Sequence, residues 1–268
     1  METPDTDVLK GHIWVGIFLP DTASKMALLE IKRLNKHFGG IQAVSDCTFS
    51  VAEGSITSLI GPNGAGKTTV FNLVTGLLSS DSGEVIFKDK KITGLQPHEI
   101  TRRGISRTFQ ITRDLQEMTV LEIMVIQSQV KGFFDMFGSS MLKHEAVHAM
   151  ELLSFVGITH LAQEKAKNLS YGQKKLMEFA SVLMSEPKLI MLDEPAGGVN
   201  PTLLESIIDR ILELNKKGIT FLIVEHNMDL VMKISDPVIC MAYGTVLAQG
   251  CPKDIQNNNL VMEAYLGE

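Results

Sequence analysis

The amino-acid sequence predicts an α/β fold: a doubly wound core of parallel strands with a helical block inserted into it. Two nearly continuous apolar runs, KLIMLDEP at 188–195 and GITFLIVEH at 218–226, are typical of parallel strands that are buried on both faces. Between about residues 112 and 186 strand signals disappear and the pattern becomes helical. Before this block, strand and helix patterns alternate along the chain.

The first half of the chain supplies the strands and the helix that open the fold. Residues 27–38 and 46–54 are predicted to be strands, the second of which ends in a turn at Glu53-Gly54. A short buried strand at 55–60 leads into a helix at 66–78. The apolar residues on one side of this helix are Val70, Leu73, Val74 and Leu77.

The remaining elements lie at the edges of the fold. Residues 82–93 (SGEVIFKDKKIT) are predicted to form an edge strand. Residues 237–250 (PVICMAYGTVLAQG) are predicted to form a hairpin that turns at Tyr243-Gly244, and residues 251–268 a closing helix.

Composition narrows the classes of protein that need to be considered. The chain has 268 residues and a formal net charge of −6, which gives no global electrostatic reason to bind nucleic acid. Cys47, Cys240 and Cys251 form no disulfide framework or metal-ligand spacing, which suits a reducing compartment. No stretch approaches the roughly 18 apolar residues of a membrane span. Residues 1–25 are predicted to be an extension outside the fold, which begins at Met26.

The stretch SLIGPNGAGKTTV contains a phosphate loop. Gly61, Gly66, Lys67 and Thr68 match the pattern G-x-x-x-x-G-K-[ST] between a predicted strand and a predicted helix. Glycines let backbone amides converge on an anion, and the start of the helix adds its dipole. Lys67 is expected to reach the β- and γ-phosphates, and the Thr68 hydroxyl to ligate Mg²⁺.

Two later strand ends supply the acidic and basic groups that such a loop needs. Asp193 ends a buried strand and is expected to hold the Mg²⁺ shell, while Glu194 would polarise the attacking water. His226 ends the next strand and would emerge beside the same phosphate. The alternatives are a strand end capped by solvated acids, and a structural histidine.

The segment NLSYGQKKLMEFASVLMSEP, at 168–187, contains a second candidate anion site. Ser170 and Gln173 form a predicted capping box at the start of an amphipathic helix, and Gly172 leaves backbone amides bare. Because the chain already has a complete phosphate loop, this helix end is expected to face the γ-phosphate held by a partner molecule.

These motifs resemble those of ATP-binding cassette (ABC) ATPases, from about Leu28 to the C-terminus. LSYGQ resembles the family signature LSGGQ, with Tyr171 in place of the first glycine, and SRTFQ places Gln110 at the Q-loop glutamine. Phe38, in NKHFGG, matches the aromatic that stacks on adenine, and His226 the switch histidine. A core aromatic (Phe38) and a solvated loop residue (Gln110) are the alternatives. Asn200 stands where the family usually has an aspartate.

The resemblance implies a P-loop NTPase (RecA-like) core with an N-terminal antiparallel β subdomain and an inserted α-helical subdomain, all within residues 26–268. The implied cofactors are ATP and Mg²⁺. The implied catalytic residues are Glu194, His226 and Gln110, and the implied metal-site residues are Thr68, Gln110 and Asp193. The implied nucleotide-binding residues are Phe38, Gly61, Pro62, Asn63, Gly64, Ala65, Gly66, Lys67, Thr68, Thr69, Ser170, Tyr171, Gly172 and Gln173.

The closest branch by resemblance is the ATPase subunits of branched-chain amino-acid importers, whose relatives also serve urea and short amides. GLQPHEITRRGISRTFQITRDL, LSYGQKKLMEFA, LDEPAGGVNP and EAYLG carry this resemblance. It implies a second ATPase subunit, with a heterodimer favoured over a homodimer. It also implies two integral-membrane permease subunits, an external solute-binding protein, no nucleic acid, and a peripheral place at the cytoplasmic face of the inner membrane.

Two groups of residues can be interpreted either as part of a binding surface or as having a purely structural or solvent-facing role. The permease is expected to dock around residues 111–124, and Phe133, Phe134, Met136 and Phe137 belong either to this surface or to the helical core. The basic residues Arg102, Arg103, Arg107 and Arg113 form a solvated face, or else steer ATP or meet acidic permease loops.

Two other classes of protein share the phosphate loop. Soluble ABC proteins of DNA repair need a long coiled-coil insert between Gln110 and Leu169, but only 58 residues lie between these two positions. Those of translation usually carry two cassettes in one chain, whereas this sequence has one. A nucleotide-binding regulatory module without turnover would not need Glu194 and His226. Both alternatives are therefore disfavoured.

Overall fold

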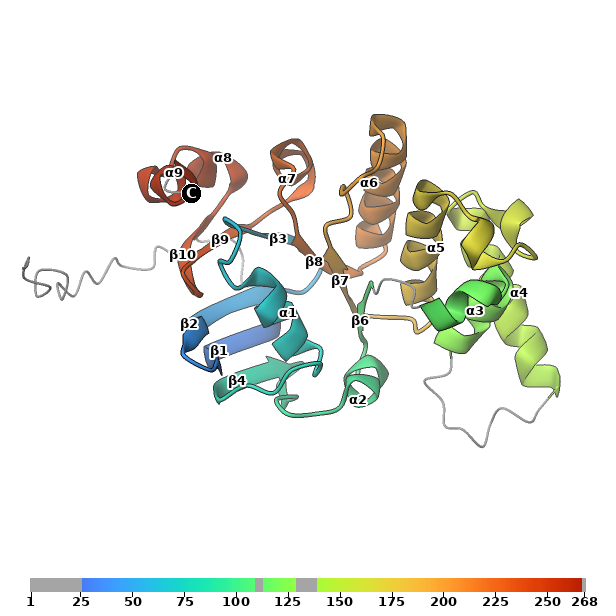
Figure 1. Ribbon diagram of the computed structural model, residues 1–268, viewed down its shortest axis with the longest axis horizontal. Coiled ribbons are helices and arrows are strands. Elements are labelled where there is room, and N and C mark those ends of the chain that lie inside the picture. The colour runs from blue at the N-terminus through green and yellow to red at the C-terminus, as the bar shows by residue number, and fades with distance from the viewer. Residues whose placement is uncertain (1–25, 109–112, 129–138, 267–268) are drawn as a thin grey trace, which may run out of the picture.

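The computed structural model describes residues 26–108, 113–128 and 139–266, and it contains two sheets with helices around them (Figure 1). The larger sheet has the strand order β10-β9-β3-β8-β7-β6. Its strands are β3 (Ile56–Ile60), β6 (Ile105–Arg107), β7 (Leu189–Asp193), β8 (Thr220–Val224), β9 (Val238–Ala242) and β10 (Thr245–Gly250). All neighbouring pairs are parallel except β9 and β10, which form the predicted hairpin.

The central strands of this sheet are covered on both faces. Every residue of β3, β8 and β9 is buried. Because both faces of these strands are covered by other elements, neither face contacts water. Continuous apolar runs can therefore form strands here without alternating polar residues. The carboxyl ends of the parallel strands meet at one edge, which is where open α/β sheets place their ligands.

The smaller sheet is antiparallel and has the order β2-β1-β4-β5. Its strands are β1 (Ala27–Phe38), β2 (Ile41–Ala52), β4 (Ser82–Phe87) and β5 (Lys90–Lys91). Helix α1 (Lys67–Val74) shares one buried apolar cluster with both sheets, through side chains such as Val70, Phe71 and Val74. This packing fixes α1, and the loop before it, at the junction of the two sheets (Figure 1).

Helices cover the face of the large sheet that is opposite α1, and further helices form the inserted block. The helices on this face are α6 (Pro201–Lys216), α7 (Met228–Ile234), α8 (Pro252–Gln256) and α9 (Asn259–Leu266). Helix α2 (Pro97–Arg102) lies instead on the side of α1, where Ile100 belongs to the same apolar cluster as α1. The block contains α3 (Val120–Gln127), α4 (Ser139–Phe155) and α5 (Tyr171–Leu183), with short 3-10 turns at 113–117, 159–161 and 166–168. One apolar cluster joins this block to α6 and to the sheet. The predicted fold class is confirmed.

Three details of the prediction are wrong. Helix α1 stops at Val74, because Gly76 turns the chain with a φ of 72° and packs so closely on the Leu95 carbonyl that a side chain would collide with it. Leu77, expected on the buried face, is 47% exposed. The predicted edge strand is a β4–β5 hairpin, and the predicted closing helix is broken into α8 and α9. Within the described ranges, no helix is long and apolar enough to cross a membrane.

Candidate functional site

The phosphate loop connects β3 to α1 at the carboxyl edge of the large sheet. Gly61 and Gly66 have φ values of 142° and 98°, a region of backbone conformation that residues with a Cβ rarely adopt. A Cβ on Gly61 would collide with the Met241 carbonyl on β9, so the loop passes too close to the sheet for any larger residue. The loop is further fixed by the hairpin, where the Gly244 amide donates to the Ala65 carbonyl at 3.1 Å.

Lys67 lies inside this loop. Its side chain is buried, and Nζ donates to the carbonyls of Gly61 and Pro62 at 2.6 and 2.8 Å. The ammonium is therefore held at the centre of the loop. Gly66 is the N-cap of α1, so no side chain covers the first amides of the helix, and Thr68 is exposed on its first turn. Amides, ammonium and hydroxyl together form an arrangement suited to a polyphosphate.

The carboxylate of Asp193, the predicted metal ligand, is held by an arginine. Asp193 is the last residue of β7, and its Oδ2 accepts a hydrogen bond at 2.7 Å from Nη2 of Arg107, the last residue of the neighbouring strand β6. Nη1 of Arg107 donates to Oδ1 of Asn72 on α1 at 2.6 Å, and the guanidinium lies over the Phe71 ring at 5.4 Å. This network links Asp193 to the helix that follows the phosphate loop.

The interpretation of Arg107 as part of a solvated face is therefore wrong. Arg107 is only 8% exposed, because β6 joins the sheet beside β7 and turns the side chain toward Asp193. Arg102 and Arg103 are exposed, as that interpretation expects, and the side chain of Arg113 lies outside the described residues. The sequence contains little signal of this pairing, because Arg107 and Asp193 are 86 positions apart and no strand is predicted at 105–107.

Glu194 and His226 meet at the same edge of the sheet. Strands β7 and β8 are parallel neighbours, and Nε2 of His226 lies 3.1 Å from Oε1 of Glu194. Glu194 has a φ of 49°, a conformation that costs about 1–3 kcal/mol in a residue with a side chain. Its amide donates to the Val224 carbonyl at 2.9 Å, which fixes the backbone there. Both side chains remain partly exposed and accessible to a ligand.

A buried acid that the sequence analysis missed fixes the loop around this pair. Glu225 is 2% exposed, and its carboxylate accepts hydrogen bonds from the amides of Ala196, His226 and Asn227 at 2.7, 2.8 and 2.9 Å. One side chain thus anchors the segment after Glu194 and the backbone of His226. The signal in the sequence was an acidic residue ending the apolar run GITFLIV, directly before the histidine.

The start of α5 has the predicted capping box. The Gln173 amide donates to Oγ of Ser170 at 3.3 Å, and the Ser170 amide donates to Oε1 of Gln173 at 2.8 Å. Gly172 packs so closely on Leu203 of α6 that a Cβ would lie 2.6 Å from its methyl group. In Figure 1, α5 and α1 lie apart with β6 and β7 between them, so the two candidate anion sites do not meet within one chain.

The remaining predicted residues have different outcomes. Phe38 ends β1 with 45% of its surface exposed, beside the ammonium of Lys36 at 5.6 Å from the ring centre, so it is not a core aromatic. Asn200 is the N-cap of α6 and accepts a hydrogen bond from the Leu203 amide at 2.9 Å. Gln110 and the four residues Phe133, Phe134, Met136 and Phe137 lie outside the described residues.

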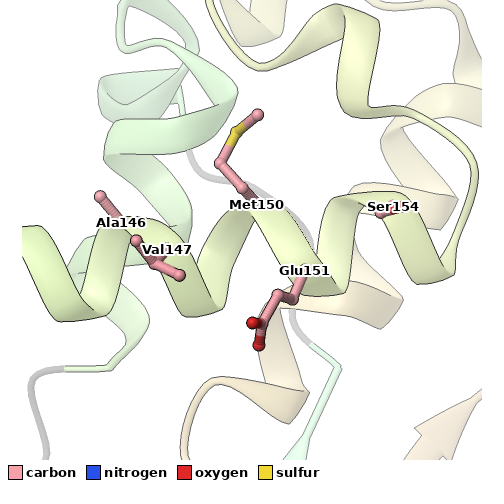
Figure 2. Close-up of a pocket in the computed structure, with 5 residues that line it drawn as sticks. All are labelled: Ala146, Val147, Met150, Glu151 and Ser154. Atoms are coloured by element: carbon pink, nitrogen blue, oxygen red, sulfur yellow. The ribbon is translucent and has the colours of Figure 1, made fainter.

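A hollow of about 440 Å³ lies away from these groups, on α4 (Figure 2). Its lining residues are Ala146, Val147, Met150, Glu151 and Ser154. The lining comes from one helix of the inserted block and is mostly apolar, so it has no set of donors for a phosphate. We assign it no part in nucleotide binding.

The fold and the site define the class of this protein. A glycine loop around a buried lysine, followed at the same sheet edge by Asp193, Glu194 and His226, is the arrangement of a phosphate-loop ATPase. The family model described as ABC transporter matches residues 44–197. The chain therefore belongs to the ABC transporter family and is one of its ATP-binding ATPases.

Similar proteins agree with this assignment over nearly the whole chain. A protein of Archaeoglobus fulgidus named "Probable branched-chain amino acid transport ATP-binding protein LivG" is 45% identical over 247 residues, 90% of this chain and 96% of that protein. The "High-affinity branched-chain amino acid transport ATP-binding protein LivG" of Escherichia coli (strain K12) is 40% identical over 251 residues, 90% of this chain and 98% of that protein. A solved ATP-binding cassette of an ABC transporter in its ADP conformation superposes with a TM-score of 0.81 at 38% identity, covering 91% of this chain and all of the other.

Proposed function

We propose that this chain hydrolyses Mg·ATP to power the import of branched-chain amino acids through partner permease subunits. The names of the similar proteins support this cargo. The alternative cargo is another small polar solute, such as urea or a short amide. The observation that carries the enzymatic part is the contact between Glu194 and His226 at the edge that also holds the phosphate loop.

The residues fit a shared nucleotide and metal site. The described residues contain no cluster of three or more His, Cys, Asp or Glu side chains that could hold a metal. Mg²⁺ suits such a site because it commonly binds through one or two carboxylates, waters and substrate phosphates. Asp193 and the Thr68 hydroxyl would hold it, with Gln110 as a further candidate, and when bound it would neutralise charge developing on the phosphates.

Each of the chain's own groups has one task in this reaction. Lys67 and the backbone N–H groups of Gly61 and residues 63–69 bind and orient the phosphates, and Phe38 stacks on the base. Glu194 accepts a proton from the attacking water, and His226 fixes the Glu194 carboxylate through Nε2. Arg107 fixes Asp193 by occupying one carboxylate oxygen.

The second anion site implies a partner. Ser170, Tyr171, Gly172 and Gln173 would cover the nucleotide of a second ATPase subunit, because α5, which begins at these residues, lies away from α1 and the phosphate loop before it (Figure 1). Two such subunits would close head-to-tail on two nucleotides and open after hydrolysis. A related but different second subunit, two integral-membrane permease subunits and an external solute-binding protein complete the proposed transporter. In it, this chain would lie at the cytoplasmic face of the inner membrane.

Substitution of Glu194 tests the enzymatic proposal. Glu194→Gln should keep ATP affinity and lose turnover by about 10²- to 10⁴-fold, the usual effect of removing a general base. Glu263→Gln is the matched control, because Glu263 is exposed on α9. Unchanged hydrolysis by purified Glu194→Gln would refute the role of Glu194.

Uptake measurements test the cargo. Cells lacking the gene should lose uptake of labelled leucine, and wild-type protein should restore it whereas Glu194→Gln should not. Loss of urea or amide uptake with leucine uptake unchanged would contradict the proposed cargo.

A further inference from the structure

Tyr171 contacts the loop that follows Glu194 in its own chain. Its hydroxyl donates a hydrogen bond to the Gly197 carbonyl at 2.9 Å. Its ring packs so closely on Gly198 that a Cβ there would lie 3.0 Å from the nearest ring carbon. Gly198 has a φ of 69°, so the glycine allows both the turn and the close approach of the ring.

This contact determines which acceptor receives the hydrogen bond of the Tyr171 hydroxyl. A tyrosine hydroxyl has one proton to donate, and here the Gly197 carbonyl accepts it. While this bond is made, Tyr171 cannot also donate that proton to a phosphate. The residue that departs from the LSGGQ pattern therefore has a contact within its own chain that a glycine could not make.

The loop that Tyr171 contacts is hydrogen-bonded to the backbone of Glu194. The Gly197 amide donates to the Glu194 carbonyl at 3.0 Å, which closes a tight turn directly after the catalytic candidate. On the other side of the turn, the Ala196 amide is held by Glu225 at 2.7 Å. Tyr171 adds an anchor from α5, so the turn is fixed between the end of β8 and the start of α5.

We propose that Tyr171 is a positioning residue, whose hydroxyl ties the turn after Glu194 to the start of α5 and so holds the Glu194 carboxylate in place. This inference rests on the proposed function, in which Glu194 serves the nucleotide of its own chain and the start of α5 covers the nucleotide of the partner. The hydrogen bond then makes the position of Glu194 depend on the position of α5.

Tyr171→Phe tests the inference, because it removes the hydroxyl and keeps the ring on Gly198. The matched control is Tyr243→Phe, since Tyr243 is 84% exposed at the β9–β10 turn. Tyr171→Phe should lower kcat by about two- to tenfold, the range expected from one hydrogen bond. KM, ATP affinity and melting temperature should stay at the control values, which separates positioning from a structural role.

Hydrogen exchange gives a second readout that needs no turnover. The amides of Ala196, Gly197 and Gly198 should exchange faster in Tyr171→Phe than in wild type or Tyr243→Phe, with α5 unchanged. Unchanged exchange in this segment, an unchanged kcat, or a kcat that falls together with the melting temperature would each overturn the inference. An inactive wild-type protein would instead contradict the proposed function, and the exchange measurement would still decide the role of Tyr171.

Discussion

The ion pair between Arg107 and Asp193 allows the carboxylate of Asp193, the proposed metal ligand, to be perturbed without being replaced. We consider Arg107→Met, which keeps most of the apolar stem and removes the charge and both hydrogen bonds. Breaking a buried ion pair typically costs about 3–5 kcal/mol. The Asp193 side chain is 25% exposed, so water compensates part of this loss, and about 2 kcal/mol of unfolding free energy should be lost.

Urea unfolding followed by circular dichroism measures this loss as a lower midpoint at unchanged slope. Arg103→Met is the control, because Arg103 is exposed and should change the free energy by less than about 0.5 kcal/mol. The double variant with Asp193→Asn should lose less than the sum of the two single losses, because the residues are in contact. An Arg107→Met free energy within about 0.5 kcal/mol of wild type, or strict additivity, would refute the reasoning.

Two further predictions concern titratable side chains away from the reaction. Burial raises the pKa of Cys47 to about 12 and that of Cys240 to about 11, while Cys251 is exposed. A thiol reagent at mildly alkaline pH should therefore modify Cys251 rapidly and the other two only after unfolding; two or more fast thiols in the folded protein would contradict this. Hydrogen bonds from the Lys36 side chain and from the His37 backbone amide lower the pKa of Asp81. The contribution of Asp81 to stability is therefore present above its unfolded pKa of about 4 and is lost as pH falls. The stability gap between wild type and Asp81→Asn should shrink as the pH is lowered below about 4, and a constant gap from neutral to acidic pH would disprove the assignment.

The parts of the site that could be predicted from the sequence are those whose residues are neighbours in the chain. The phosphate loop and the capping box at Ser170 are local patterns, in which spacing alone fixes the geometry. Asp193 and His226 could be placed at one edge because each ends a buried apolar run and parallel strands align their ends.

The parts that could not be predicted depend on contacts between distant segments. The strand at 105–107 is too short to give a periodic pattern, and with it the pairing of Arg107 with Asp193 was missed. The bond from Tyr171 to Gly197 joins two segments whose approach depends on how α5 packs against α6. The end of α1 was misplaced because the contact of Gly76 with the Leu95 carbonyl overrides an apolar pattern that continues to Leu77.

The central claim is that one chain supplies two parts of a nucleotide site that meet only between two molecules. The most direct test is light scattering of the Glu194→Gln protein with Mg·ATP, with and without Ser170→Arg. Ser154→Arg, on the exposed side of α4, is the control for adding a bulky charge. We expect an ATP-dependent doubling of mass that Ser170→Arg abolishes while each monomer still binds ATP. A Ser170→Arg protein that fails to bind ATP as a monomer, or that still doubles its mass, would contradict it.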